Sequence, residues 1–98
     1  MAQADREKIT AIRAYFEDKF PGWSIAHHYD VERNLEVFAI EGGVVPQCFT
    51  VKITPGFLDS YKAEELPFRL HDWQVGDFVK VSGLWPILVS ESGLRSLR

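Results

Sequence analysis

The sequence predicts an α+β fold, in which a three-stranded antiparallel meander, extendable by a fourth strand, is packed by helices on one face as a two-layer sandwich. Three observations lead to this class. An apolar stripe at helical spacing lies near the N-terminus, three alternating segments joined by short turns follow it, and a second helical region comes after them. The expected element order is αβββα(α)β.

The composition is that of one folded α+β domain over residues 1–98. Hydrophobic residues make up 46% of the chain and charged residues 26%, which is typical of globular proteins. Seven Phe, three Tyr and three Trp supply enough large side chains for one core. The formal charge of −3 gives no net attraction to nucleic acid or to an anionic membrane.

The cellular compartment is predicted from what the sequence lacks. No apolar run approaches the roughly 20 residues that cross a bilayer, and residues 1–8 have no apolar stretch of the secretory type. The single cysteine, Cys48, excludes an intrachain disulfide and a thiolate metal cluster made by one chain. We therefore expect a cytoplasmic protein that does not enter membranes.

The first predicted element is a helix over Asp5–Phe20. Its apolar residues recur at spacings of three and four and so form one stripe: Ile9, Ile12, Phe16 and Phe20. The Pro21-Gly22 pair ends this helix, because proline cannot extend it and glycine accepts the turn.

Three strands are expected next. Trp23–Asp30 alternates between two faces, Leu35–Glu41 is apolar on both faces, and the segment from Phe49 to Thr54 alternates again. Gly42-Gly43 permits a tight turn, and Pro46 favours a loop over 44–47. Because a strand that is apolar on both faces is usually central, we place Leu35–Glu41 in the middle of the meander.

The C-terminal half is predicted to be mainly helical before a last strand. Thr54 and Pro55 are typical of an N-cap and of the first position of a helix. The segment Trp73–Gly83 fits either a helix, with Asp72 as its N-cap, or a Gly-Asp turn and a strand, and the helix is slightly favoured. Trp85–Ser90 is expected to be the last strand, followed by a turn and a polar tail.

The main functional hypothesis concerns the face of the sheet that the helices leave uncovered. The central strand offers the pair Val37 and Ala39 to one face and the pair Phe38 and Ile40 to the other, and the sequence does not fix which pair points inward. Trp85 precedes Pro86 at a corner where a tryptophan either closes the core or anchors an interface. We predict a small non-catalytic protein that associates with a protein partner or with a second copy through Phe38, Ile40 and Trp85.

A ligand-binding or enzymatic pocket near His27, His28 and Cys48 is the alternative. Adjacent strand residues point to opposite faces, so His27 and His28 cannot share one ion in a regular strand. Asp30 shares a face with His28, but two ligands are fewer than a zinc site normally has. No catalytic motif surrounds Cys48, so we expect no metal and no cofactor.

Nucleic-acid binding is the least favoured alternative. The helix-strand-strand-strand-helix order resembles, in topology alone, the double-stranded-RNA-binding domain, a family that carries a lysine cluster at the start of its last helix. Here the segment from Pro55 to Glu65 has one base, Lys62, beside Asp59, Glu64 and Glu65. Charge therefore opposes RNA binding unless the scattered bases converge into one patch: Arg33, Lys52, Lys80, Arg95 and Arg98.

Overall fold

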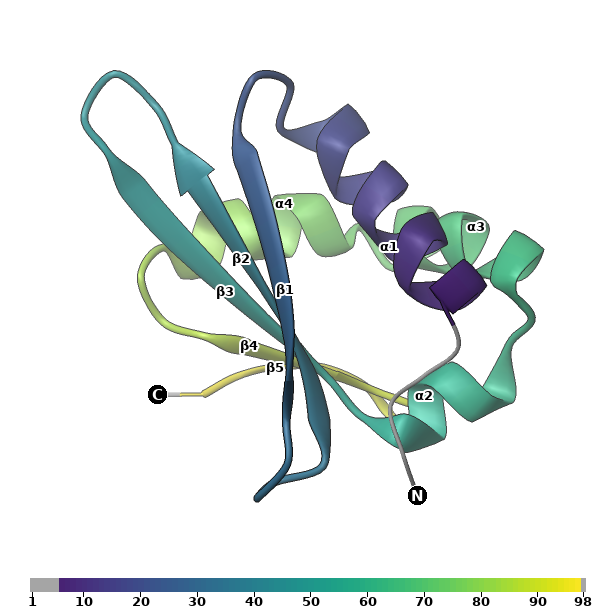
Figure 1. Ribbon diagram of the computed structural model, residues 1–98. Coiled ribbons are helices and arrows are strands. Elements are labelled where there is room, and N and C mark those ends of the chain that lie inside the picture. Colours follow the sequence, from purple (N-terminus) through teal and green to yellow (C-terminus); the bar gives the residue numbers. More distant parts are fainter. Residues whose placement is uncertain (1–5, 98) are drawn as a thin grey trace.

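The protein is an α+β fold with a five-stranded sheet, as seen in a computed structural model that describes residues 6–97. The elements in chain order are α1 (Arg6–Lys19), β1 (Ser24–Asp30), β2 (Leu35–Gly42), β3 (Gln47–Ile53), α2 (Pro55–Ser60), the 3-10 turn η1 (Ala63–Glu65), α3 (Leu66–Asp72), α4 (Val75–Ser82), β4 (Ile87–Ser90) and β5 (Gly93–Ser96). The strands lie in the order β1-β2-β3-β4-β5, and the helices pack on one face of the sheet (Figure 1). The predicted α+β class is confirmed. The sheet has one strand more than the prediction of three strands and a possible fourth.

Helix α1 lies on the sheet as its apolar stripe predicts. Ile12, Phe16 and Phe20 are buried, and the Phe16 ring centroid lies 5.9 Å from that of Phe38 on β2. The chain then turns at Gly22, which has a φ of +83° that favours glycine. The predicted helix start at Asp5 lies outside the described residues. None of the described helices has the length and apolar character that a bilayer span requires.

The β1-β2-β3 meander is confirmed, with β2 in the middle. Ile25 pairs with Ile40 and Ile40 with Phe49, and both pairings are antiparallel. At the hairpin end, the backbone of Gly42 lies against the Trp23 ring, where an added Cβ would be 2.8 Å from two ring carbons. A side chain at this position would displace Trp23, which stacks on Phe49 with ring centroids 5.5 Å apart.

The ambiguous segment Trp73–Gly83 is helical, as α4. Thr54 caps α2 as predicted, its hydroxyl accepting a hydrogen bond from the Phe57 amide at 3.2 Å. The expected N-cap of α4, however, is wrong: Asp72 ends α3, and Gln74 takes the cap position in the left-handed conformation without a side-chain hydrogen bond.

The C-terminal strands differ from the sequence prediction in three ways. The last predicted strand begins at Ile87 instead of Trp85, because Trp85 donates its amide to the Ser82 carbonyl in a turn and Pro86 has no amide hydrogen. Strand β4 is parallel to β3, since the long helical connection between them permits a crossover. The expected polar tail contains a fifth strand, β5, which is antiparallel to β4.

The N-terminus of α4 is completed by a side chain from α1. The hydroxyl of Tyr15 accepts a hydrogen bond of 2.9 Å from the buried amide of Gly76, at a helix start where the N-cap side chain makes none. Burial raises the pKa of the Tyr15 phenol above its ordinary value, an effect that the hydrogen bond from Gly76 partly offsets. Tyr15 thus joins the first and last of the described helices.

Replacing Tyr15 with phenylalanine is expected to lower the free energy of unfolding by about 1–2 kcal/mol at neutral pH, because the buried Gly76 amide loses its acceptor. Urea unfolding measures this loss.

The same contact should depend on pH. Because the pKa of Tyr15 is raised in the folded state, the phenol's contribution to the free energy of unfolding is complete below its ordinary pKa and is lost as the pH rises through the folded value. The difference in the free energy of unfolding between wild type and Tyr15→Phe should therefore become smaller at alkaline pH. The half-buried Tyr61 supplies the control Tyr61→Phe, and an equal loss there would contradict the capping role.

Candidate functional site

The three residues predicted to bind a partner occupy different environments. Phe38 and Ile40 are both 0% exposed and belong to the core, so their expected surface position is wrong. They point inward because α1 packs on this face of β2, where the ring of Phe16 from α1 lies against that of Phe38. Trp85 is 53% exposed, so it lies at the surface and does not close the core.

The uncovered sheet face is less apolar than expected. Val37 and Ala39 are the pair of β2 that faces away from the core, and Val37 is itself buried by its neighbours. Across the sheet, Val37 belongs to a mixed row that runs through His28, Val37, Lys52, Leu88 and Arg95. Among the described residues, no large hydrophobic side chain that is mostly exposed lies on a strand. The sheet face is therefore not the strongest candidate for an interface.

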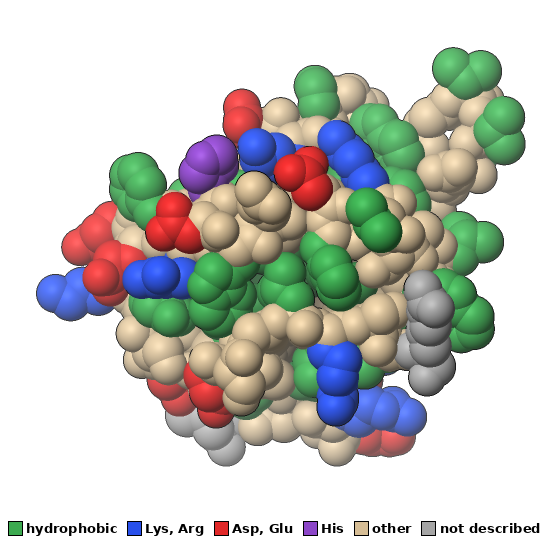
Figure 2. Space-filling model, turned by 180° about the vertical axis from the view of Figure 1, so that it is seen from behind, with side chains coloured by type: hydrophobic (Ala, Val, Ile, Leu, Met, Phe, Trp, Pro, Cys, Tyr) green, Lys and Arg blue, Asp and Glu red, His purple; other side chains and the backbone are tan. Residues whose placement is uncertain are grey.

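Most of the exposed large hydrophobic side chains of the described residues lie instead toward one end of the sheet. We call this the hairpin-end surface, formed by the tip of the β2–β3 hairpin, the last turn of α4 and the α4–β4 turn: Val44, Val45, Val81, Leu84 and Trp85. Because β4 runs parallel to β3, the turn that precedes β4 lies at the same end of the sheet as the hairpin that precedes β3. Figure 2 shows hydrophobic side chains on the projecting hairpin at upper right and along the same side below it.

Hydrogen bonds on both sides of Trp85 fix the backbone that carries it. The Trp85 amide donates to the Ser82 carbonyl at 3.2 Å, and the carbonyl of the next residue, Pro86, accepts a 2.7 Å hydrogen bond from the Leu97 amide. Gly83, with a φ of +62°, allows the chain to leave α4 at this sharp angle. The indole is thus presented from an ordered turn, which lowers the entropy lost when it is buried by a partner.

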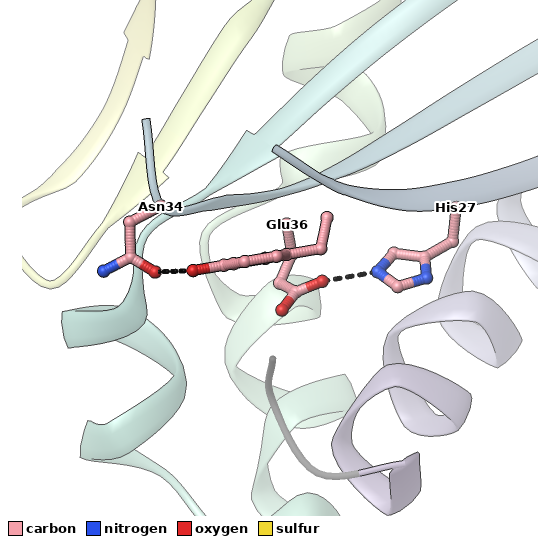
Figure 3. Close-up of polar contacts among 4 residues, drawn as sticks. His27, Asn34 and Glu36 are labelled. Carbon is pink, nitrogen blue, oxygen red and sulfur yellow. Dashed lines mark hydrogen bonds and ion pairs between the residues drawn. The ribbon is translucent and has the colours of Figure 1, made fainter. Parts of the chain in front are cut away.

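A polar pair is buried on the helix-covered face near the other end of β1 and β2. The Nε2 atom of His27 lies 2.5 Å from Oε1 of Glu36, and Glu36 is only 2% exposed (Figure 3). The His27 ring packs on Phe38, with ring centroids 4.9 Å apart. Beside this pair, the hydroxyl of Tyr29 donates to Oδ1 of Asn34. The imidazole and the carboxylate therefore lie within hydrogen-bond distance of each other.

Sequence analysis missed Glu36 as the partner of His27. The available signal was its position in β2: Glu36 alternates with Val37 and so shares a face with Phe38 and Ile40, which the meander buries. A carboxylate at an inward strand position needs a polar partner. His27, which points inward from the neighbouring strand, supplies it.

The structure does not bring His27, His28 and Cys48 together. His27 points toward the helices, whereas His28 is exposed on the opposite face beside Val37. Cys48 is exposed and pairs with Glu41, and the groove of about 330 Å³ that it lines is otherwise formed by hairpin residues: Glu41, Gly42, Gly43, Pro46 and Gln47. Residues 6–97 contain no group of three or more His, Cys, Asp or Glu side chains that could hold a metal ion. The predicted pocket is therefore not formed.

Nucleic-acid binding would require the scattered basic residues to form one patch. Those that the structure describes lie on different parts of the molecule. Lys52 and Arg95 share the mixed row on the uncovered face, with Leu88 between them. Lys80 instead covers the Phe20 ring on the helical side, 5.2 Å from its centroid. Arg33 pairs with Asp30 at 3.4 Å, and its amide, 3.2 Å from the same carboxylate, is the main reason that the pKa of Asp30 is lowered. Arg98 lies outside the described residues.

Comparisons of this chain with protein-family models, with curated proteins and with solved structures find no match.

Proposed function

We propose that this protein acts without catalysis, by binding another protein chain through the hairpin-end surface, with Trp85 as the central contact. The observation that carries the proposal is the exposure of the Trp85 indole on a hydrogen-bonded turn, among other hydrophobic side chains at the same end of the sheet.

The distribution of exposed hydrophobic residues supports this surface over others. Of the seven large hydrophobic side chains that are mostly exposed among the described residues, five belong to the hairpin-end surface. The other two, Val31 and Phe68, lie singly on the β1–β2 turn and on α3. Isolated apolar side chains are normal at a protein surface, whereas a cluster indicates an interaction site. Tryptophan is also among the residues that most often dominate binding energy.

Replacing Trp85 with alanine is expected to weaken binding to the partner by at least about 30-fold, which corresponds to the loss of one interface hot spot. Immobilised wild-type protein and the Trp85→Ala variant are exposed to the same cell extract, and the proteins that only wild type retains are identified. Each is then purified, and its affinity for both chains is measured by calorimetry.

Phe68→Ala is the matched control, because it removes an exposed aromatic side chain that lies on α3, outside the hairpin-end surface. Both variants should unfold at nearly the wild-type denaturant concentration. Partners that bind wild type and Trp85→Ala equally well would show that Trp85 is not the central contact.

A further inference from the structure

We infer that the chain bound by the hairpin-end surface is a second copy of this protein, arranged about a two-fold axis. In this arrangement the hairpin tip of each copy, Val44 and Val45, lies against the α4–β4 turn of the other, Leu84 and Trp85. The inference rests on the proposed function and names its partner.

The shape of this end suits a reciprocal contact. The β2–β3 hairpin projects beyond the rest of the molecule, whereas the α4–β4 turn lies lower along β3 and closer to the body (Figure 1), since Ile87 at the start of β4 pairs with Val51. In a two-fold interface, a contact between one element of the first copy and a different element of the second is repeated with the two copies exchanged. The two halves of the hairpin-end surface provide such a pair, and one contact would cover both.

The area is sufficient for a dimer. Val44 is fully exposed, and Val45 and the three residues near the end of α4, Val81, Leu84 and Trp85, are each more than half exposed. Together the five residues expose on the order of 700 Å² per copy, and burial of all of it on both copies would remove about 1,400 Å², which falls within the size range of specific interfaces. Neither Phe68 nor Val31, each exposed alone, offers a comparable area.

The charges near this surface are compatible with self-association. None of the five side chains that form it is charged, so their burial leaves no unpaired charge. The nearest charged neighbours in sequence have opposite signs, with Glu41 on β2 before the hairpin and Lys80 on α4 before Val81. Two copies therefore do not bring a cluster of like charges together.

Pairing of two copies through the sheet edges is less favourable. At the β1 edge, the guanidinium of Arg13 donates a hydrogen bond to the carbonyl of Ile25, which a pairing strand would have to displace. At the β5 edge, the strand has only four residues, and Arg95 is exposed on it. These features discourage edge-to-edge contacts and leave the hairpin-end surface as the route to a dimer.

Sedimentation equilibrium between about 10 and 300 µM tests whether the protein associates with itself. Wild type is expected to form a dimer at tens of micromolar. The exposed hairpin residue Val45, changed to aspartate, should raise the dimer dissociation constant by at least 30-fold, because two charges would be buried. Val31→Asp, in the β1–β2 turn, is the matched control and should dimerise like wild type. A monomer at 300 µM, or equal weakening by both variants, would overturn the inference.

Cross-linking tests the arrangement within the dimer. In a Cys48→Ser background, one chain carries Val45→Cys and a second, distinguished by mass, carries Leu84→Cys. A short bismaleimide should join the two different chains in a mixture faster than it joins either chain to itself. Faster joining of Val45→Cys chains to each other would overturn the exchanged arrangement. A protein that is monomeric but still binds another partner through Trp85 would overturn the dimer while leaving the proposed function intact.

Discussion

Replacing Phe38 with alanine is expected to lower the free energy of unfolding by about 3–5 kcal/mol, as is typical when a buried phenylalanine is truncated. The Phe38 side chain is fully buried in the centre of β2, where it contacts the Phe16 and His27 rings. Truncation removes the transfer free energy of the ring and leaves a cavity that the surrounding strands fill only in part. Chemical denaturation followed by circular dichroism measures the loss.

Trp85→Ala is the control for this experiment, since it removes a larger side chain from an exposed position. We expect it to lower the free energy of unfolding by clearly less than Phe38→Ala does, because about half of the Trp85 surface is already exposed in the folded protein. If Phe38→Ala unfolds the protein completely, Phe38→Leu should still give a measurable loss of about 1–2 kcal/mol. Equal losses from Phe38→Ala and Trp85→Ala would contradict the core position of Phe38.

Local sequence patterns were enough to predict the meander and the helix that covers it. The period of α1, the alternation of β1 and β3, and the Thr54 cap all reflect interactions within a few residues of one another. The choice between Phe38 and Val37 as the inward residue could not be made this way, because both neighbours are apolar and only the position of the helices decides between them.

The C-terminal half depended on contacts between distant segments. Strand β5 has few apolar residues and exists because β4 supplies its hydrogen-bond partners. The parallel pairing of β3 with β4 follows from the path of the helical connection, which no local pattern reveals. The N-terminus of α4 likewise depends on Tyr15, sixty-one residues earlier in the chain, so that a search for a nearby cap selected Asp72 instead.

The candidate site was predictable only in part for the same reason. The Leu84-Trp85-Pro86 corner was recognised from its sequence, and Trp85 is exposed there. Val44 and Val45 were assigned to a loop, but nothing local showed that this loop and the Trp85 turn lie at the same end of the sheet. Their shared end of the sheet is a consequence of the parallel strand pair, and it is what makes the hairpin-end surface a candidate interface.

The second substitution that we expect to change the free energy of unfolding strongly is in the His27–Glu36 pair. His27→Leu should lower the free energy of unfolding by about 2–4 kcal/mol, because the buried Glu36 carboxylate loses the imidazole that lies 2.5 Å away. The double variant His27→Leu/Glu36→Leu should recover most of this loss, since two apolar side chains of suitable size can pack where the hydrogen-bonded polar pair was. A double-mutant cycle measured by urea unfolding gives the coupling free energy of the pair.

A substitution at the neighbouring His28 is the control for this double-mutant cycle. His28→Leu changes the same residue type one position along β1, but on the exposed face, and should alter the free energy of unfolding by no more than about 0.5 kcal/mol. A coupling free energy near zero between His27 and Glu36 would mean that the pair is not an energetic unit. The expected result is a large coupling free energy and a double variant that binds its partner as tightly as wild type does. The pair would then stabilise the fold without taking part in binding at the hairpin-end surface.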